Sequence, residues 1–153
     1  MNLIEKRIQR AVESVLENEA LTSGLDEDAA SALQDWGIKN VKKIAEETGD
    51  LDDERAEEAM YPKMKASRSL MRAIRVWVEH EKDSSTEERA KLWSKIERKA
   101  QGLYGAELEL PNAATFSEKS GADFVKDLLA WFDDFAAGGE DEKKGFFQSL
   151  FGR

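Results

Sequence analysis

The chain has a single histidine, His80, and it stands between Glu79 and Glu81. A histidine beside carboxylates has the residue types of a general base or a metal ligand. Helical di-metal sites, however, take a Glu-x-x-His motif from each of two helices, and the position three before His80 is Trp77. No serine, lysine or aspartate is placed by the sequence to complete a triad. We therefore expect His80 to be a surface residue near a helix end, with no catalytic residue and no bound metal or cofactor.

A run of eight carboxylates occupies residues 46–58. Glu54 shares a helix face there with Glu57 or Glu58, and together with water molecules such a pair has the oxygen ligands that Mg²⁺ accepts. A cluster of acids at the start of a helix also offsets the positive end of the helix dipole. We favour this second interpretation, a solvated helix start, over a magnesium site.

A stripe of cations follows on the same predicted helix. Lys65, Arg68, Arg72 and Arg75 are spaced by three, four and three residues, which aligns them on one face. Arginine forks match the geometry of carboxylates and phosphates. The stripe is either an anion- or acidic-partner-binding site or a set of intramolecular pairs with the run at 46–58. Exposed pairs of that kind contribute only about 0–1 kcal/mol each, so they would yield to a partner.

The C-terminal block 146–153 holds a second candidate surface. In a helix, its large apolar side chains would cover less than half of the circumference. These candidate partner-binding residues are Phe146, Phe147, Leu150 and Phe151. A helix so short is not stable by itself and needs a preformed groove.

Three interpretations of this block compete. It docks on its own bundle, it is a helix-in-groove ligand for another protein, or it lies weakly on a membrane surface. The acids at 140–142 oppose attraction to anionic lipid, which ranks the membrane third. The spacing Phe147-x-x-Leu150-Phe151 resembles the short amphipathic C-terminal targeting peptides by which some bacterial cargo proteins enter protein shells. That resemblance covers only the last few residues.

Apolar residues that recur at three and four positions predict five helices and almost no strand. The predicted helices cover residues 2–19, 25–48, 50–82, 85–102 and 115–137. Gly37 predicts a bend or split in the second helix, and Pro62 predicts a kink or two helices meeting near Tyr61. Ser85 with Glu88 forms a predicted capping box at the start of the fourth helix. We interpret the four tryptophans, one in each of the last four helices, as core residues.

The fifth helix carries a second predicted capping box, Thr115 with Glu118, and the pair Gly138–Gly139 is expected to end it. The sequence thus predicts an all-α fold, a single-domain antiparallel bundle of about five helices with a short amphipathic C-terminal segment. We assign residues 1–137 to the bundle, 138–145 to a glycine-containing charged linker and 146–153 to the amphipathic segment.

Composition limits the function. The chain has 153 residues, a net charge of −9 and no cysteine. This charge argues against nucleic-acid binding, which needs clustered cations, and we find no candidate membrane span. We expect a cytoplasmic, non-enzymatic helical interaction or adaptor protein that binds another protein or itself. The alternative is a regulator or enzyme that binds an anionic small molecule, such as a phosphate or nucleotide, at the basic stripe.

Overall fold

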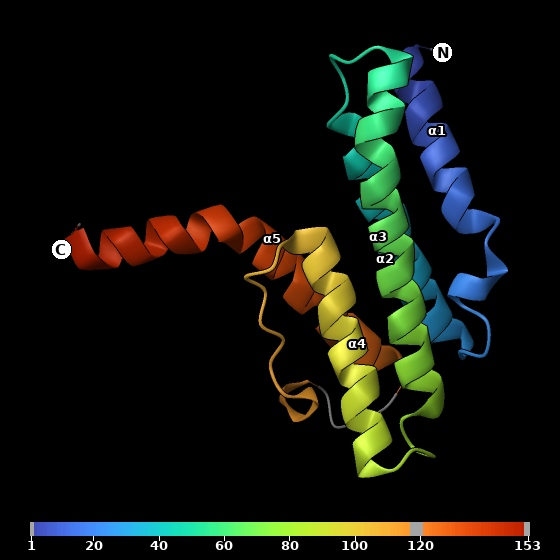
Figure 1. The fold of residues 1–153 in the computed structure, drawn as a ribbon, viewed down its shortest axis with the longest axis vertical. Coiled ribbons are helices and arrows are strands. Elements are labelled where there is room, and N and C mark those ends of the chain that lie inside the picture. The colour runs from blue at the N-terminus through green and yellow to red at the C-terminus, as the bar shows by residue number, and fades with distance from the viewer. Residues whose placement is uncertain (1, 117–120, 152–153) are drawn as a thin grey trace.

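The part of the chain that the structure describes folds into five α-helices, and the first four alternate in direction along the molecule (Figure 1). The computed structural model describes residues 2–116 and 121–151, with side chains up to residue 138. The helices are α1 (Leu3–Leu16), α2 (Glu27–Glu46), α3 (Asp53–His80), α4 (Thr86–Tyr104) and α5 (Ala122–Phe151). Short 3-10 helices occur at Glu19–Leu21 (η1) and Ala113–Thr115 (η2), and the described residues contain no strand. The predicted all-α, single-domain bundle is confirmed.

Each of the first four helices begins at a side chain that accepts a hydrogen bond from the backbone N–H three residues later, which satisfies an otherwise orphaned donor. The caps are Asn2, Asp26, Asp52 and Ser85. Ser85 caps α4 as predicted, with 3.1 Å between its Oγ and the Glu88 nitrogen. The reciprocal hydrogen bond from the Ser85 N–H to the Glu88 side chain is not formed in the described structure, so the predicted capping box is only half present. α3 starts at Asp53, after its cap Asp52, and not at residue 50 as the sequence predicted.

Neither Gly37 nor Pro62 divides its helix. α2 runs unbroken through Gly37, and α3 runs unbroken through Pro62, so the prediction of two helices meeting near Tyr61 is wrong. Pro62 removes one backbone donor and leaves the carbonyl of Glu58 without its usual partner. Both residues are exposed, so water can satisfy that carbonyl and the helix can continue.

α5 differs from its prediction at both ends. It begins at Ala122 rather than after Thr115, which instead closes η2, and Glu118 of the predicted capping box lies outside the described residues. Gly138 and Gly139 do not end the helix, which continues to Phe151. Each glycine weakens a helix by about 1 kcal/mol but does not forbid it. Figure 1 shows the second half of α5 extending away from the other helices; the predicted domain boundary at 138–145 stays a prediction.

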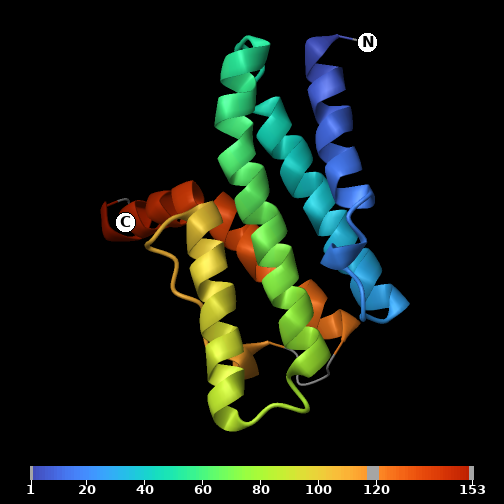
Figure 2. The ribbon, with the colours of Figure 1, turned by 45° about the vertical axis from the view of Figure 1, so that its right-hand side comes forward.

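α2 lies at the centre of the packing. It contacts α1, α3 and α5, while α4 packs along the second half of α3 (Figure 2). The core between these helices is apolar, and its largest fully buried side chains include Leu33, Leu70, Ile74, Leu128 and Phe132. The tryptophans pack in or against this core, with the Trp77 and Trp93 ring centroids 4.8 Å apart.

Candidate functional site

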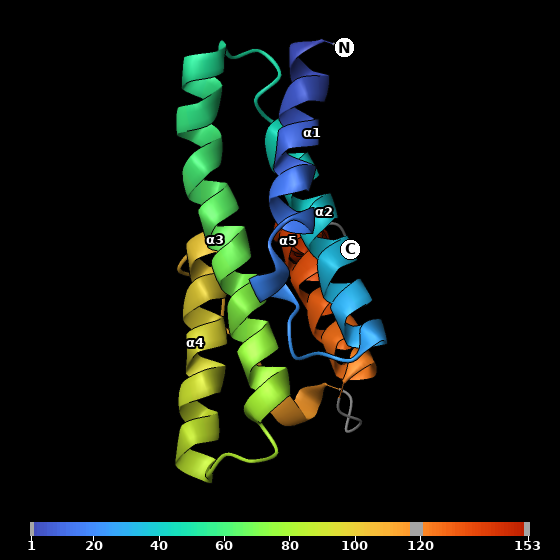
Figure 3. The ribbon, with the colours of Figure 1, turned by 90° about the vertical axis from the view of Figure 1, so that its right-hand side faces the viewer.

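The solvent face of α3 carries one continuous stripe of large polar and aromatic side chains. Its residues are spaced by four, three, four, three and four positions and lie opposite the buried Leu70 and Ile74. We call this stripe the α3 outer face; it consists of Glu54, Glu58, Tyr61, Lys65, Arg68 and Arg72. All six side chains are exposed except Arg68, which is half-buried. Figure 3 shows α3 at the edge of the molecule, with α4 beside only its second half.

Charge is ordered along this face. Two acids come first, three cations come last, and Tyr61 stands between them with 60% of its surface exposed. Within the described part of the chain, no carboxylate forms an ion pair with Lys65, Arg68 or Arg72. Lys65 and Arg72 are exposed and Arg68 is half-buried, and we call these three residues the presented cations.

Among the other cations of α3, Lys63 and Arg75 make ion pairs that join the helix or stabilise it within the molecule. Lys63 Nζ lies 3.2 Å from Glu47 Oε2, which is the kind of pairing with the acidic run that the sequence suggested. Arg75 lies 2.8 Å from Glu79 Oε2 and donates to the Ser23 carbonyl at 3.3 Å, so it ties α3 to the loop that follows α1. The predicted stripe thus splits into three presented cations and one, Arg75, that is engaged.

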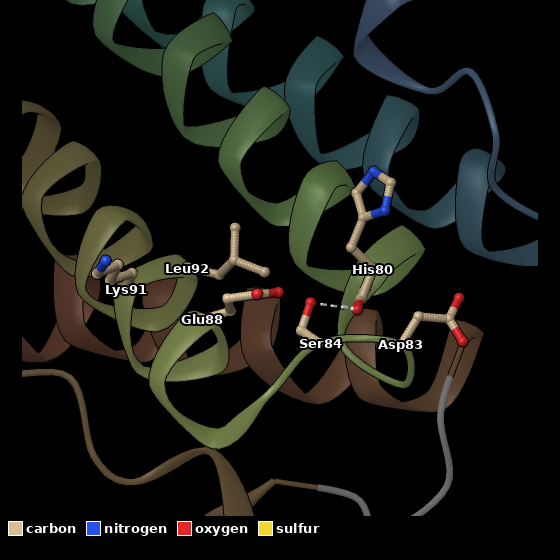
Figure 4. A pocket seen from close by; sticks show the side chains of 6 residues that line it. All are labelled: His80, Asp83, Ser84, Glu88, Lys91 and Leu92. Atoms are coloured by element: carbon tan, nitrogen blue, oxygen red, sulfur yellow. Dashed lines mark hydrogen bonds between the residues drawn. The ribbon is translucent and has the colours of Figure 1, made fainter.

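His80 is the last residue of α3, and its side chain is exposed (Figure 4). Its Nε2 lies 3.8 Å from Glu79 Oε2, and the imidazole has no hydrogen-bond partner among the described side chains. A shallow depression of about 450 Å³ lies beside it, between the end of α3 and the start of α4. The described residues hold no group of three or more potential metal-ligating side chains. Nothing here orients the imidazole as a general base would need.

A second cleft, which the sequence did not reveal, lies between α2, the end of α4 and α5. Its volume is about 270 Å³. Its lining residues are Trp36, Lys39, Asn40, Lys43, Tyr104, Asp133, Ala136 and Ala137. We call it the α2–α5 cleft.

Two buried polar atoms in the α2–α5 cleft have no hydrogen-bond partner among the described residues. They are Asn40 Oδ1 and the Tyr104 hydroxyl. Nearby, Trp36 Nε1 donates to Asp133 Oδ1 at 3.0 Å. Burial, followed by the charge of Asp133, raises the pKa of Tyr104 above its ordinary value, so the phenol stays neutral. Buried polar groups are normally paired, and two orphans in one cleft mark it as a place where a ligand or water completes the structure.

No motif in the sequence could have identified this cleft. Trp36 and Asp133 are 97 positions apart and are joined only by the packing of α2 on α5. Each residue type, taken by itself, is typical of any helical surface.

The C-terminal candidates lie in a part of α5 where only the backbone is described. Phe146, Phe147, Leu150 and Phe151 belong to the helix, but their side chains lie outside the described part of the structure. Whether they pack on the bundle or on a partner therefore stays a prediction.

No protein-family model, no curated protein and no solved structure matches this chain. Among the described residues, none of the helices combines the length and the apolar character needed to cross a membrane.

Proposed function

We propose that the protein is a non-enzymatic helical interaction or adaptor protein of the cytoplasm, and that the α3 outer face is its contact surface. The observation that carries the proposal is the order of side chains on this face, acidic, then aromatic, then basic, with the cations presented to solvent. The partner that this order favours is a second copy of the chain.

An antiparallel pair of α3 helices would be self-complementary. A two-fold axis beside residue 63 places Glu58 opposite Arg68 of the other copy, and Glu54 opposite its Arg72. The same axis places Tyr61 over the aliphatic stem of Lys65. A two-fold interface repeats each contact, so the pairing doubles every favourable charge contact. A parallel pair would instead place acid beside acid and cation beside cation.

The residue types also suit an interface. Tyrosine and arginine are enriched among residues that dominate binding energy, whereas lysine and glutamate supply register and specificity. The stripe extends over about 27 Å of helix, because the 18 steps from Glu54 to Arg72 rise about 1.5 Å each. One helix face of this length gives a small contact, which is typical of a weak or transient association rather than an obligate dimer.

Charge-reversed variants test the proposal. Arg68→Glu places a second carboxylate against Glu58 of the other copy, and Glu58→Arg places two arginines together, so each variant is expected to be monomeric in sedimentation equilibrium. An equimolar mixture of the two variants should dimerise, because each unlike pair is then restored. Arg98→Glu, the same change at an exposed position of α4, is the matched control and should behave as the unaltered chain does.

These measurements decide whether the chain associates with itself through α3. A wild-type chain that is monomeric at millimolar concentration, or a mixture of the two variants that stays monomeric, rules out self-association through α3. Added salt should weaken the wild-type dimer, because exposed charge pairs are screened.

A second candidate function rests on the same presented cations. Lys65, Arg68 and Arg72 could instead hold an anionic small molecule such as a phosphate or nucleotide, as a regulator or enzyme would. Titration with inorganic pyrophosphate followed by calorimetry separates the two. Saturable binding that Arg72→Glu abolishes favours this candidate, and the absence of heat counts against it.

The C-terminal segment is proposed as a further contact surface, through Phe146, Phe147, Leu150 and Phe151. Its support is the helical backbone that continues to Phe151 and extends from the bundle (Figure 1).

A further inference from the structure

Besides the carboxylate of Asp133, which already accepts the Trp36 indole N–H, the α2–α5 cleft presents groups of three different kinds to one small volume. Asn40 Oδ1 accepts hydrogen bonds, the neutral Tyr104 hydroxyl both donates and accepts, and the ammonium groups of Lys39 and Lys43 carry positive charge. The volume of about 270 Å³ lies just below the usual range for drug-sized ligands, which favours a compact molecule.

We propose that this cleft binds a compact carboxylate that also carries an amide or urea group. The amide N–H would donate to Asn40 Oδ1, and the amide carbonyl would accept from the Tyr104 hydroxyl. The carboxylate would lie at the opening, beside Lys39 and Lys43, whose side chains are exposed there. One such molecule satisfies both orphaned atoms and places its single negative charge beside the two lysines.

The inner wall of the cleft is held in place before any ligand arrives. The Tyr104 ring stacks on Phe132 at a centroid distance of 5.7 Å and meets the edge of Phe135 at 6.2 Å. Asp133 already accepts the Trp36 indole N–H, which fixes the side of the cleft formed by α5. A wall that needs no rearrangement lowers the ordering cost of binding.

The selectivity follows from the orphaned atoms. A ligand without the amide leaves Asn40 Oδ1 and the Tyr104 hydroxyl buried and unpaired, and such groups disfavour the complex strongly. A ligand without the carboxylate loses the electrostatic attraction of the two lysine ammonium groups. Both functional groups are therefore needed in the same molecule.

The test is a titration of the full ¹⁵N-labelled chain with 3-ureidopropionate, followed by NMR. We expect saturable shifts of the Trp36 indole and Asn40 side-chain amide signals. Propionate and propionamide, each with only one of the two functional groups, are the control probes, and at the same concentration and ionic strength they should give at most a tenth of the saturation.

Variants decide whether the binding uses the proposed groups. Tyr104→Phe removes only the hydroxyl and should weaken binding about tenfold, the cost of one lost hydrogen bond to a buried group. Tyr61→Phe makes the same change on the α3 outer face and should leave binding unchanged. Replacing Lys39 and Lys43 by glutamine should weaken 3-ureidopropionate and leave propionamide unaffected.

Three results would each overturn the proposal. They are an absence of saturation with 3-ureidopropionate, equal saturation by propionate, and unchanged affinity in Tyr104→Phe. The first would mean that the cleft holds water only. None of these results bears on the association of α3, because the cleft and the α3 outer face share no residue.

Discussion

Gly37 of α2 lies directly against the side chain of Met71 of α3. A Cβ on Gly37 would stand 2.6 Å from both the Sδ and the Cε of Met71, and 3.3 Å from Cγ1 of Val15. Three helices, α1, α2 and α3, thus meet at this glycine. All three residues are buried, so the glycine that looked like a weakness in the sequence is a packing position.

Gly37→Ala should therefore destabilise the protein although alanine is the better helix former. The substitution gains about 1 kcal/mol of helix propensity but forces buried side chains aside, which costs about 1–3 kcal/mol. We expect a net loss of about 1 kcal/mol in the free energy of unfolding, measured by urea denaturation.

The contact with Met71 gives this prediction its control. Met71→Ala alone should cost about 2–5 kcal/mol through the cavity that it leaves. In that background Gly37→Ala has room and should stabilise by about 1 kcal/mol. Gly102→Ala, at a position of α4 where an added Cβ meets nothing within 4 Å, should stabilise the unaltered chain by about 0.5–1 kcal/mol. Equal gains at positions 37 and 102 would contradict the proposed contact.

Arg7 of α1 links this helix to the start of α3 through hydrogen bonds. Its guanidinium donates to the Thr48 carbonyl at 2.9 Å, to the Leu51 carbonyl at 2.8 Å and to Asp53 Oδ1 at 3.0 Å. The Arg7 side chain is only 7% exposed. Arg7→Met should lower the free energy of unfolding by about 3 kcal/mol, because it leaves the carbonyls of the α2–α3 connection without their donor. Thermal and urea unfolding both measure this loss.

Asp53→Asn separates the carbonyl contacts from the ion pair. The Asp53 side chain is 72% exposed, and a solvated pair contributes little, so this variant should lose less than about 1 kcal/mol. A loss as large as that of Arg7→Met would show that the charge pair, and not the backbone contacts, holds the connection.

Helical periodicity predicted the number and type of the helices because an amphipathic helix must bury one face whatever it packs against. Single glycine and proline residues were less reliable signals of helix ends, because tertiary packing and solvent exposure decide whether a helix continues through them. Gly37, Pro62 and Gly138–Gly139 do not divide their helices. Gly37 accommodates Met71, and the chain near Pro62 is solvated. A residue that weakens a helix is not enough to end it when neighbouring residues favour continuation.

The candidate sites depended on information that the sequence holds only in part. The sequence placed the basic residues of α3 on one helix face. The acids at 54 and 58 and Tyr61 were not recognised as part of the same face, although their spacing of three and four residues would have shown it. The hydrogen bond from Arg75 to the Ser23 carbonyl and the α2–α5 cleft both arise from tertiary packing. Neither has a local pattern, because each joins residues far apart in the chain.

Removing residues 139–153 tests the role of the C-terminal segment. The second half of α5 extends from the other helices (Figure 1), so we expect the free energy of unfolding to change by less than about 1 kcal/mol in urea. Phe132→Ala, at a fully buried position of the first half of α5, is the control for a true core residue and should cost about 3–5 kcal/mol. A truncation that costs as much as this control would mean that the segment belongs to the core and is not offered to a partner.

Tyr104 should make the protein less stable in alkali. Burial, and then the charge of Asp133, raise its pKa above the ordinary 10.0, so above about pH 10 the unfolded chain releases a proton that the folded chain keeps. Fewer protons are then bound in the unfolded state, and the free energy of unfolding falls by up to about 1.4 kcal/mol per pH unit until the folded phenol also ionises. Tyr104→Phe removes this loss. The free energies of unfolding of the two chains, measured in urea, should therefore diverge between pH 9 and 11, with the variant more stable at the alkaline end.

At neutral pH the variant should be equal to the unaltered chain or slightly more stable, because it removes a buried hydroxyl that has no partner among the described residues. Parallel curves across this range would mean that the phenol reaches solvent in the folded protein, and a variant destabilised at neutral pH would mean that the hydroxyl is paired and the α2–α5 cleft is part of the core.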